Sequence, residues 1–242
     1  MIATLASVTL RGLLNRRRTL LLVLFGVLIV GVAALSRLSE PTEAEALEFT
    51  GRLLADFGLA VLLPLVAVIV GTAAIGSEME DGTIIYLLAK PIRRILIVAV
   101  KLVVAWLLVV ILVAPAILLG GLVGTGGSAD LAVAYASATV VGALEYTAVF
   151  LALSLVTSRA LVIGLAYVVI WEGVVAGLFA GTRILSIRQH ALAVGDALGG
   201  DGAVRAELGV GTALLVAAVV AVLAFALAVR RLQRVELRGD SA

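Results

Sequence analysis

Long uninterrupted apolar runs are the dominant pattern of the chain. A helix needs about 20 mainly apolar residues to cross the ~30 Å hydrocarbon core of a bilayer. Six runs suited to this task alternate with polar or glycine-rich segments, and they predict spans at Thr19–Ser36, Phe57–Gly76, Ile95–Gly124, Leu131–Thr157, Leu161–Gly181 and Gly209–Val229. The pattern therefore predicts an all-α, polytopic membrane protein with a single transmembrane domain over residues 1–242.

The segments outside these runs differ in character. Residues 1–18 carry a helical apolar stripe and end in three arginines, which predicts a helix lying on the cytoplasmic leaflet. Residues 38–52 hold four glutamates and predict a short solvated helix. Residues 182–208 form a longer outer loop whose apolar residues predict one or two short helices. Lys101 lies near the start of the third run, where its long side chain is expected to snorkel to the interface.

Composition agrees with a lipid environment and excludes several kinds of site. Hydrophobic residues make up 63% of the chain, above the roughly 45–50% of soluble domains. Cysteine is absent, which excludes disulfides and thiolate sites, and His190 is the single histidine. Neither lysine, at 90 or 101, follows a glycine, so the chain lacks the phosphate-binding motif of nucleotide hydrolases. We therefore expect no enzyme activity and no catalytic, cofactor or metal site on this chain.

The distribution of basic residues predicts the orientation. Cytoplasmic loops of membrane proteins carry an excess of Lys and Arg. Placing the N-terminus inside puts thirteen of the eighteen basic residues on the cytoplasmic side, namely Arg11, Arg16, Arg17, Arg18, Lys90, Arg93, Arg94, Lys101, Arg159, Arg230, Arg231, Arg234 and Arg238. Six spans and this asymmetry predict that both chain ends lie in the cytoplasm.

The most informative polar segment is residues 77–94, between the second and third spans. Three acids precede Gly82-Thr83, an apolar stretch follows, and Lys90-Pro91 and paired arginines lead into the next span. Thr83 is suited to capping a short helix, and an apolar helix framed by charges is suited to docking in a groove of a partner. The residues alone equally allow a solvated connector with an interfacial helix.

This order of features resembles the permease family of ABC type-2 exporters. The resemblance extends to the six spans, the basic N-terminal helix and the outer loop, and is strongest to the short permeases that include the membrane subunit of the nitrous oxide reductase maturation exporter. It implies that residues 77–94 form the coupling helix that contacts an ATP-binding subunit. The implied contact residues are Glu78, Glu80, Asp81, Gly82, Thr83, Tyr86, Leu87, Lys90, Arg93 and Arg94.

The resemblance also implies partners and a location. Two permease chains, identical or similar, would work with two ATP-binding subunits that supply ATP and Mg²⁺ in a bacterial cytoplasmic membrane. Two other functions stay open on the residues alone: an ion-coupled secondary transporter, and a non-transporting membrane anchor. A neighbouring gene for an ATPase would separate the first function from both others.

Two carboxylates interrupt the apolar spans. Glu145 and Glu172 lie 14 and 13 residues from Arg159 in adjacent spans, which predicts similar depths in the membrane. Intramembrane carboxylates are functional candidates because inserting them costs free energy. They could line a polar or proton-sensitive cavity, or they could form structural hydrogen bonds between helices, with Tyr146, Thr147 or Tyr167 as partners.

Three glycines follow Glu172 at intervals of four residues. Gly173, Gly177 and Gly181 predict a small-residue face for close helix packing. This face could serve the bundle of one protomer or the seam of a dimer, and the family resemblance favours the seam.

Overall fold

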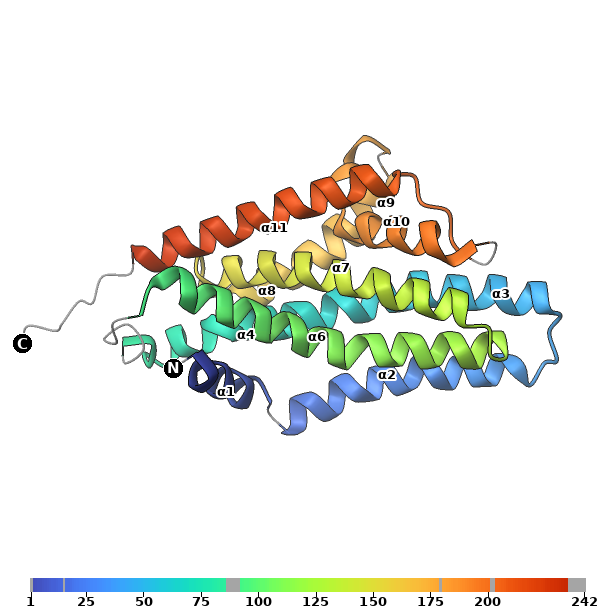
Figure 1. The fold of residues 1–242 in the computed structure, drawn as a ribbon, viewed down its shortest axis with the longest axis horizontal. Helices are drawn as coiled ribbons and strands as arrows, with labels where there is room; N and C mark the ends of the chain where they lie inside the picture. Colours follow the sequence, from blue (N-terminus) through green and yellow to red (C-terminus); the bar gives the residue numbers. More distant parts are fainter. Residues whose placement is uncertain (1, 15, 86–91, 179, 201–202, 235–242) are drawn as a thin grey trace, which may run out of the picture.

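The computed structural model describes residues 2–14, 16–85, 92–178, 180–200 and 203–234. All regular secondary structure within these residues is helical. The helices form an elongated bundle in which α2, α4, α6 and α7 follow the long axis, while α11 lies obliquely across one side (Figure 1).

The six predicted spans are confirmed. Five helical stretches are long and apolar enough to cross a membrane, and α2 adds a shorter apolar stretch at Leu22–Arg37. In chain order the spans are α2 (Arg16–Arg37), η1 with α4 (Leu53–Leu62 and Leu63–Glu80), α6 (Arg94–Thr125), α7 (Ala129–Ser154), α8 with η2 and α9 (Ala160–Ala166, Tyr167–Val175 and Ala176–Leu178), and α11 (Val210–Gln233). The amphipathic helix α1 (Ile2–Leu13) precedes them.

The second span is longer than the sequence pattern predicts. The helix α3 (Glu43–Arg52) begins at Thr42 with a reciprocal capping box to Glu45, and then continues without interruption through η1 and α4. The solvated helix expected within 38–52 is therefore the outer part of a continuous helix of 38 residues. In the π-helical segment η1 a backbone N–H binds the carbonyl oxygen five residues earlier, as from Leu63 N to Gly58 O, and Pro64 is the second residue of α4.

The helix α7 is the centre of the bundle. It contacts α4, α6, α10 and α11, and its rings of Tyr135, Tyr146 and Phe150 are fully buried. Glycines allow the closest approaches, because a Cβ atom at Gly121 of α6 would lie only 2.7 Å from Ala132 Cα of α7. Tight packing around α7 therefore fixes the positions of the second, third and fourth spans.

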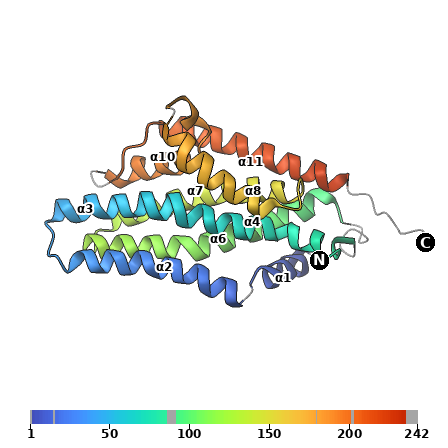
Figure 2. The same ribbon diagram turned by 180° about the vertical axis from the view of Figure 1, so that it is seen from behind.

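The fifth and sixth spans are much less covered. Only 17% of the residues in the most apolar stretch of Ala160–Leu178 are buried, and 22% of those in α11. The corresponding share in α7 is 61%. Seen from behind, α8 lies beside α4 (Figure 2). The expected short outer helices follow: the 3₁₀ turn η3 (Ala180–Leu185) and the helix α10 (Ile187–Gly199), which packs on α7 and α11.

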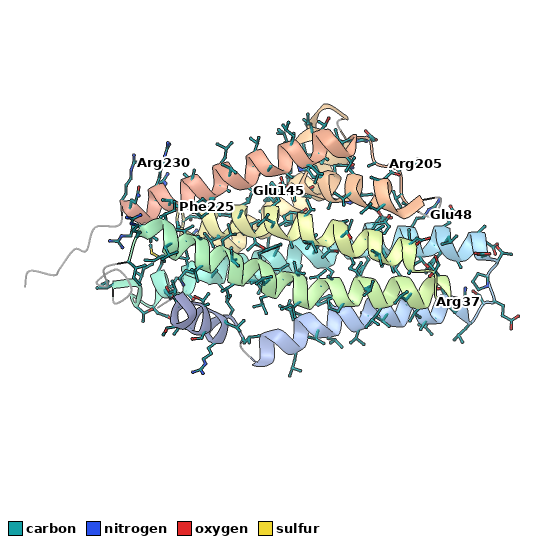
Figure 3. The ribbon with its side chains drawn as sticks, viewed as in Figure 1. Arg37, Glu48, Glu145, Arg205, Phe225 and Arg230 are labelled. Carbon is teal, nitrogen blue, oxygen red and sulfur yellow. The ribbon has the colours of Figure 1, made fainter. Side chains whose placement is uncertain are left out.

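Both ends of the described chain lie at one end of the bundle. The N-terminal helix α1 lies at the same end as the last turn of α11 (Figure 1). Figure 3 shows Arg230 at this end, Arg37, Glu48 and Arg205 at the opposite end, and Glu145 between them. The arrangement agrees with an even number of crossings, and the excess of basic residues predicts that the Arg230 end is cytoplasmic.

Candidate functional site

The acidic cluster lies at the inner end of α4. Glu78 and Glu80 occupy the last turn of that helix, and Asp81 is its C-cap residue. Gly82 then turns the chain with a positive φ of 68°, a conformation that suits glycine. Carboxylates at a helix C-terminus face the negative end of the helix dipole, so this arrangement is unfavourable unless a cation compensates it.

Lys101 supplies the compensating charge. Its Nζ atom donates to Glu78 Oε1 at 2.7 Å and to the Ala74 carbonyl oxygen at 2.8 Å. The expectation that Lys101 reaches the interface is wrong, because its side chain is 0% exposed. A buried ammonium needs a partner, and Glu78 lies within reach across the inner ends of α4 and α6.

The ion pair divides the acidic cluster by role. The Glu78 side chain is only 24% exposed and is held by Lys101, whereas Glu80 and Asp81 are exposed to solvent.

Two hollows flank these acids. One lies between α4 and the turn from α7 to α8, with Glu80 and Ser154 among its lining residues. The other lies between α4 and α1 and includes Asp81. Glu78, Glu80 and Asp81 thus form an acidic projection with a recess on either side.

The remaining residues of segment 77–94 are described only in part. Thr83 is exposed beside Gly82, and the buried Ile84 is followed by the half-exposed Ile85. Arg93 is the exposed N-cap residue of α6, and Arg94 is half-buried. Tyr86, Leu87 and Lys90 lie outside the described residues, so their contribution to an interface stays a prediction.

A second polar site lies at the outer side, where Glu172 meets the start of α10. The Glu172 carboxylate accepts hydrogen bonds from Ser186 Oγ, from Ile187 N at 2.8 Å and from the Tyr167 hydroxyl at 3.1 Å. Tyr167 and Glu172 are five residues apart in the π-helical segment η2, whose wider turn brings such positions together. Glu172 therefore satisfies donors at the N-terminus of α10.

Glu145 reaches the same turn of α10 from α7. Both of its carboxylate oxygens lie 3.0 Å from Nδ1 of His190, and both side chains are almost completely buried. A third acid, Asp56 of η1, pairs with Arg188 at 2.6 Å. Carboxylates from three spans thus converge on the first turn of α10 and hold it against the bundle.

The comparison with protein families decides between the open functions. The family model described as ABC-2 family transporter protein matches residues 14–188, which cover α2 to the first turn of α10. The chain belongs to the ABC-2 transporter family. A search of curated proteins gave no match.

Membership defines the general role of the chain. ABC-2 proteins of this kind are membrane-embedded permease subunits of ABC transporters, and they usually work with an ATP-binding subunit. The chain is accordingly a multi-pass permease subunit. The matched range includes the acidic projection, Lys101, Glu145 and Glu172.

The glycine face of this ABC-2 permease differs from the predicted one. Gly173 and Gly177 are exposed, and within the described residues no atom of another helix lies within 4 Å of a Cβ built at either position. Gly181 belongs to η3 rather than to the preceding helix, so the three glycines do not form one helical face. The protomer instead uses Gly164, where a Cβ would lie 2.4 Å from Val68 Cγ2. Gly173 and Gly177 therefore lie on the exposed surface of the protomer, and a role at a dimer seam stays a prediction.

Two site residues escaped the sequence pattern. Lys101 was expected at the interface, and no partner was predicted for His190. Their partners lie 23 and 45 residues away in sequence, so no local pattern joins them. A usable signal was the isolation of each: a charged or titratable side chain in an apolar stretch requires a partner.

Proposed function

We propose that this ABC-2 permease is the membrane subunit of an ATP-driven exporter in a bacterial cytoplasmic membrane. Two such chains, or this chain and a similar one, would work with two separate ATP-binding subunits, which bind ATP and Mg²⁺. The observation that carries the proposal is the acidic projection at the inner end of α4, anchored by Lys101 and flanked by two recesses. Export is supported by the resemblance of residues 77–94 to the coupling segment of ABC type-2 exporters.

The projection is well built to receive a push from a partner. Lys101 ties Glu78 and the Ala74 carbonyl to α6, so a displacement of the projection must move α4 and α6 together. Glu80, Asp81 and Thr83 stay exposed and are free to contact basic or polar groups of another protein.

The helix behind the projection extends across the bundle. Glu43–Glu80 is one helix of 38 residues, or about 55 Å at a rise of 1.5 Å per residue. Asp56 in its outer half is paired with Arg188 of α10. A displacement that begins at the inner end therefore has a continuous mechanical route to α3 and α10 on the outer side.

Co-purification with an ATP-binding subunit encoded beside this chain tests the proposal. Replacing both Glu80 and Asp81 by Lys should abolish co-purification and the ATP hydrolysis that depends on the permease, because it reverses the charge of the projection. The matched control replaces Glu40 and Glu43 by Lys, which makes the same charge change at the outer end. Equal binding and hydrolysis by both variants would refute docking at the projection.

A further inference from the structure

We propose that Glu145 and His190 form a buried proton-binding site that locks α10 onto the bundle. The ligand is a single proton shared between the Glu145 carboxylate and His190 Nδ1. The proposal concerns the permease chain alone and does not depend on how the ATP-binding subunit docks.

The number of protons follows from the partners of the imidazole ring. His190 Nε2 lies 2.9 Å from the Ile184 carbonyl oxygen, and a carbonyl only accepts, so Nε2 carries a hydrogen. Nδ1 lies 3.0 Å from each Glu145 oxygen. One proton between them makes either an imidazolium facing a carboxylate or a neutral imidazole facing a carboxylic acid. Both forms have zero net charge, which is the least costly state for a buried pair.

Loss of that proton would disrupt the contact. Without it, the Glu145 carboxylate faces the lone pair of Nδ1, and a net negative charge remains where both side chains are nearly inaccessible to water. Burial lowers the pKa of His190, but the hydrogen bond to Glu145 and the negative charge of Glu145 outweigh it, so the pKa is raised above its ordinary value. The site therefore keeps its proton to a higher pH than a free histidine does.

The other titratable groups near α10 have partners of their own or are neutral, although the charge of Glu172 also raises the pKa of His190, to a lesser extent than Glu145. Glu172 accepts three hydrogen bonds, one of them from Tyr167. Tyr135 on α7 accepts from Val204 N, and the stretch of α11 from 210 to 229 has no ionisable side chain. The remaining groups on the neighbouring elements are Tyr146 of α7, Asp56 with Arg188, Arg183 with Glu207, and Asp196 with Arg205. Among these described groups, Glu145 is the carboxylate in direct contact with the imidazole.

The raised pKa fixes the direction of the pH dependence. A group whose pKa is higher in the folded state stabilises it fully below the unfolded pKa, which for His is about 6.5. That stabilisation is lost as the pH rises through the folded pKa. The docking of α10 should therefore weaken as the pH rises through the folded pKa, which lies above about 6.5.

The single histidine makes the direct test simple. The full chain, labelled with ¹⁵N-histidine and placed in lipid nanodiscs, gives one imidazole to titrate by NMR. We expect Nε2 to stay protonated, and the Nδ1 titration to lie above about 6.5. Glu145→Gln should lower that midpoint by more than about one pH unit, because the carboxylate charge is gone. Glu172→Gln is the control and should change it less, because Glu172 does not contact the ring.

A second readout follows the docking itself. Ala193 on α10 is 2% exposed, so a cysteine there should resist a thiol reagent at neutral pH and react after alkaline exposure. Glu145→Gln should remove this alkaline release, since an amide can donate to a neutral Nδ1. The exposed Ser39→Cys corrects for the reagent's own pH dependence. A wild-type midpoint at or below about 6.5, or an unchanged release in the Gln variant, would overturn the proposal. If the Gln variant does not fold, the wild-type titration decides.

Discussion

The ion pair between Lys101 and Glu78 joins α6 to the inner end of α4. The Nζ atom of Lys101 on α6 lies 2.7 Å from Oε1 of Glu78 on α4, and the same ammonium donates to the Ala74 carbonyl at 2.8 Å. The contact holds the second and third spans together on the cytoplasmic side of the bundle, where the segment that connects them begins and ends. It therefore explains how an acidic projection can be stable at the unfavourable end of a helix dipole.

The first prediction concerns the stability that this contact provides. Lys101→Met should lower the free energy of unfolding by about 1.5–3 kcal/mol, because it removes two charge-assisted hydrogen bonds and leaves a partly buried carboxylate without a cation. Thermal unfolding in detergent measures the change. Adding Glu78→Gln to Lys101→Met should restore part of the loss, since the uncompensated charge is removed.

A surface ion pair in the same long helix is the control. Arg52 and Glu48 lie 2.6 Å apart, but their side chains are 69% and 64% exposed. Arg52→Met should cost no more than about 0.5 kcal/mol, because exposed pairs contribute little. Equal losses from Lys101→Met and Arg52→Met would show that the inner contact is not a structural anchor.

The second prediction concerns Glu172. Glu172→Leu removes the acceptor for Ser186 Oγ, Ile187 N and the Tyr167 hydroxyl, and it should destabilise the protein by about 1–3 kcal/mol. Glu172→Gln retains an acceptor oxygen and should cost less. The rate of proteolysis within η3 and the start of α10, together with the thermal unfolding temperature, measures both effects. Identical behaviour of the Leu and Gln variants would contradict the role of Glu172 as a cap of α10.

The membrane spans could be predicted because each depends on its own sequence. An apolar run long enough to cross a bilayer leaves the backbone no alternative to a helix. The continuity of α3 with α4 was missed because the glutamates of 43–48 indicated a separate solvated helix. No residue between Arg52 and Pro64 stops the helix, so the capping box at Thr42 starts the whole second span.

The site could be predicted only in outline. The acidic cluster and the two intramembrane glutamates stood out as charges in an apolar chain. Tyr167 was among the predicted partners and it donates to Glu172, whereas Lys101 and His190 were not predicted, because they meet Glu78 and Glu145 through tertiary packing. The π-helical segment that brings Tyr167 to Glu172 also has no local signal. Glu145 and Glu172 were expected at similar depths, either lining a polar cavity or making structural hydrogen bonds, and in the structure both bind the first turn of α10.

The third prediction concerns the exposed glycines of the fifth span. A Cβ atom built at Gly177 meets no atom of the described residues within 4 Å, so we expect Gly177→Leu to leave the thermal stability of the protomer unchanged. If this face borders a second chain, the variant should shift the dimer towards monomer in cross-linking or native mass spectrometry. Gly121→Leu is the contrasting variant, because its Cβ would collide with Ala132 and should impair folding itself. A Gly177 variant with wild-type assembly would place the seam elsewhere.

The fourth prediction concerns orientation. Ser39 is exposed in the turn between α2 and α3, and Ser158 is exposed in the turn between α7 and α8. These two turns lie at opposite ends of the bundle (Figure 1), and Ser→Cys is nearly isosteric. In intact cells a membrane-impermeant thiol reagent should modify Ser39→Cys and spare Ser158→Cys, because the basic excess places Ser158 inside. The chain has no other cysteine to give background. The reverse labelling would invert the topology and remove the acidic projection from the cytoplasm.

Cross-linking between the permease and its ATP-binding subunit tests the central claim most directly. A cysteine replacing the exposed Thr83, beside the acidic projection, should be joined to the ATP-binding subunit by a short bifunctional reagent, and ATP should change the yield. Ser39→Cys, at the outer end, should give no such product. A product with Thr83→Cys alone is the result that this account predicts. Failure of Thr83→Cys to cross-link in a complex that hydrolyses ATP would contradict docking at the inner end of α4.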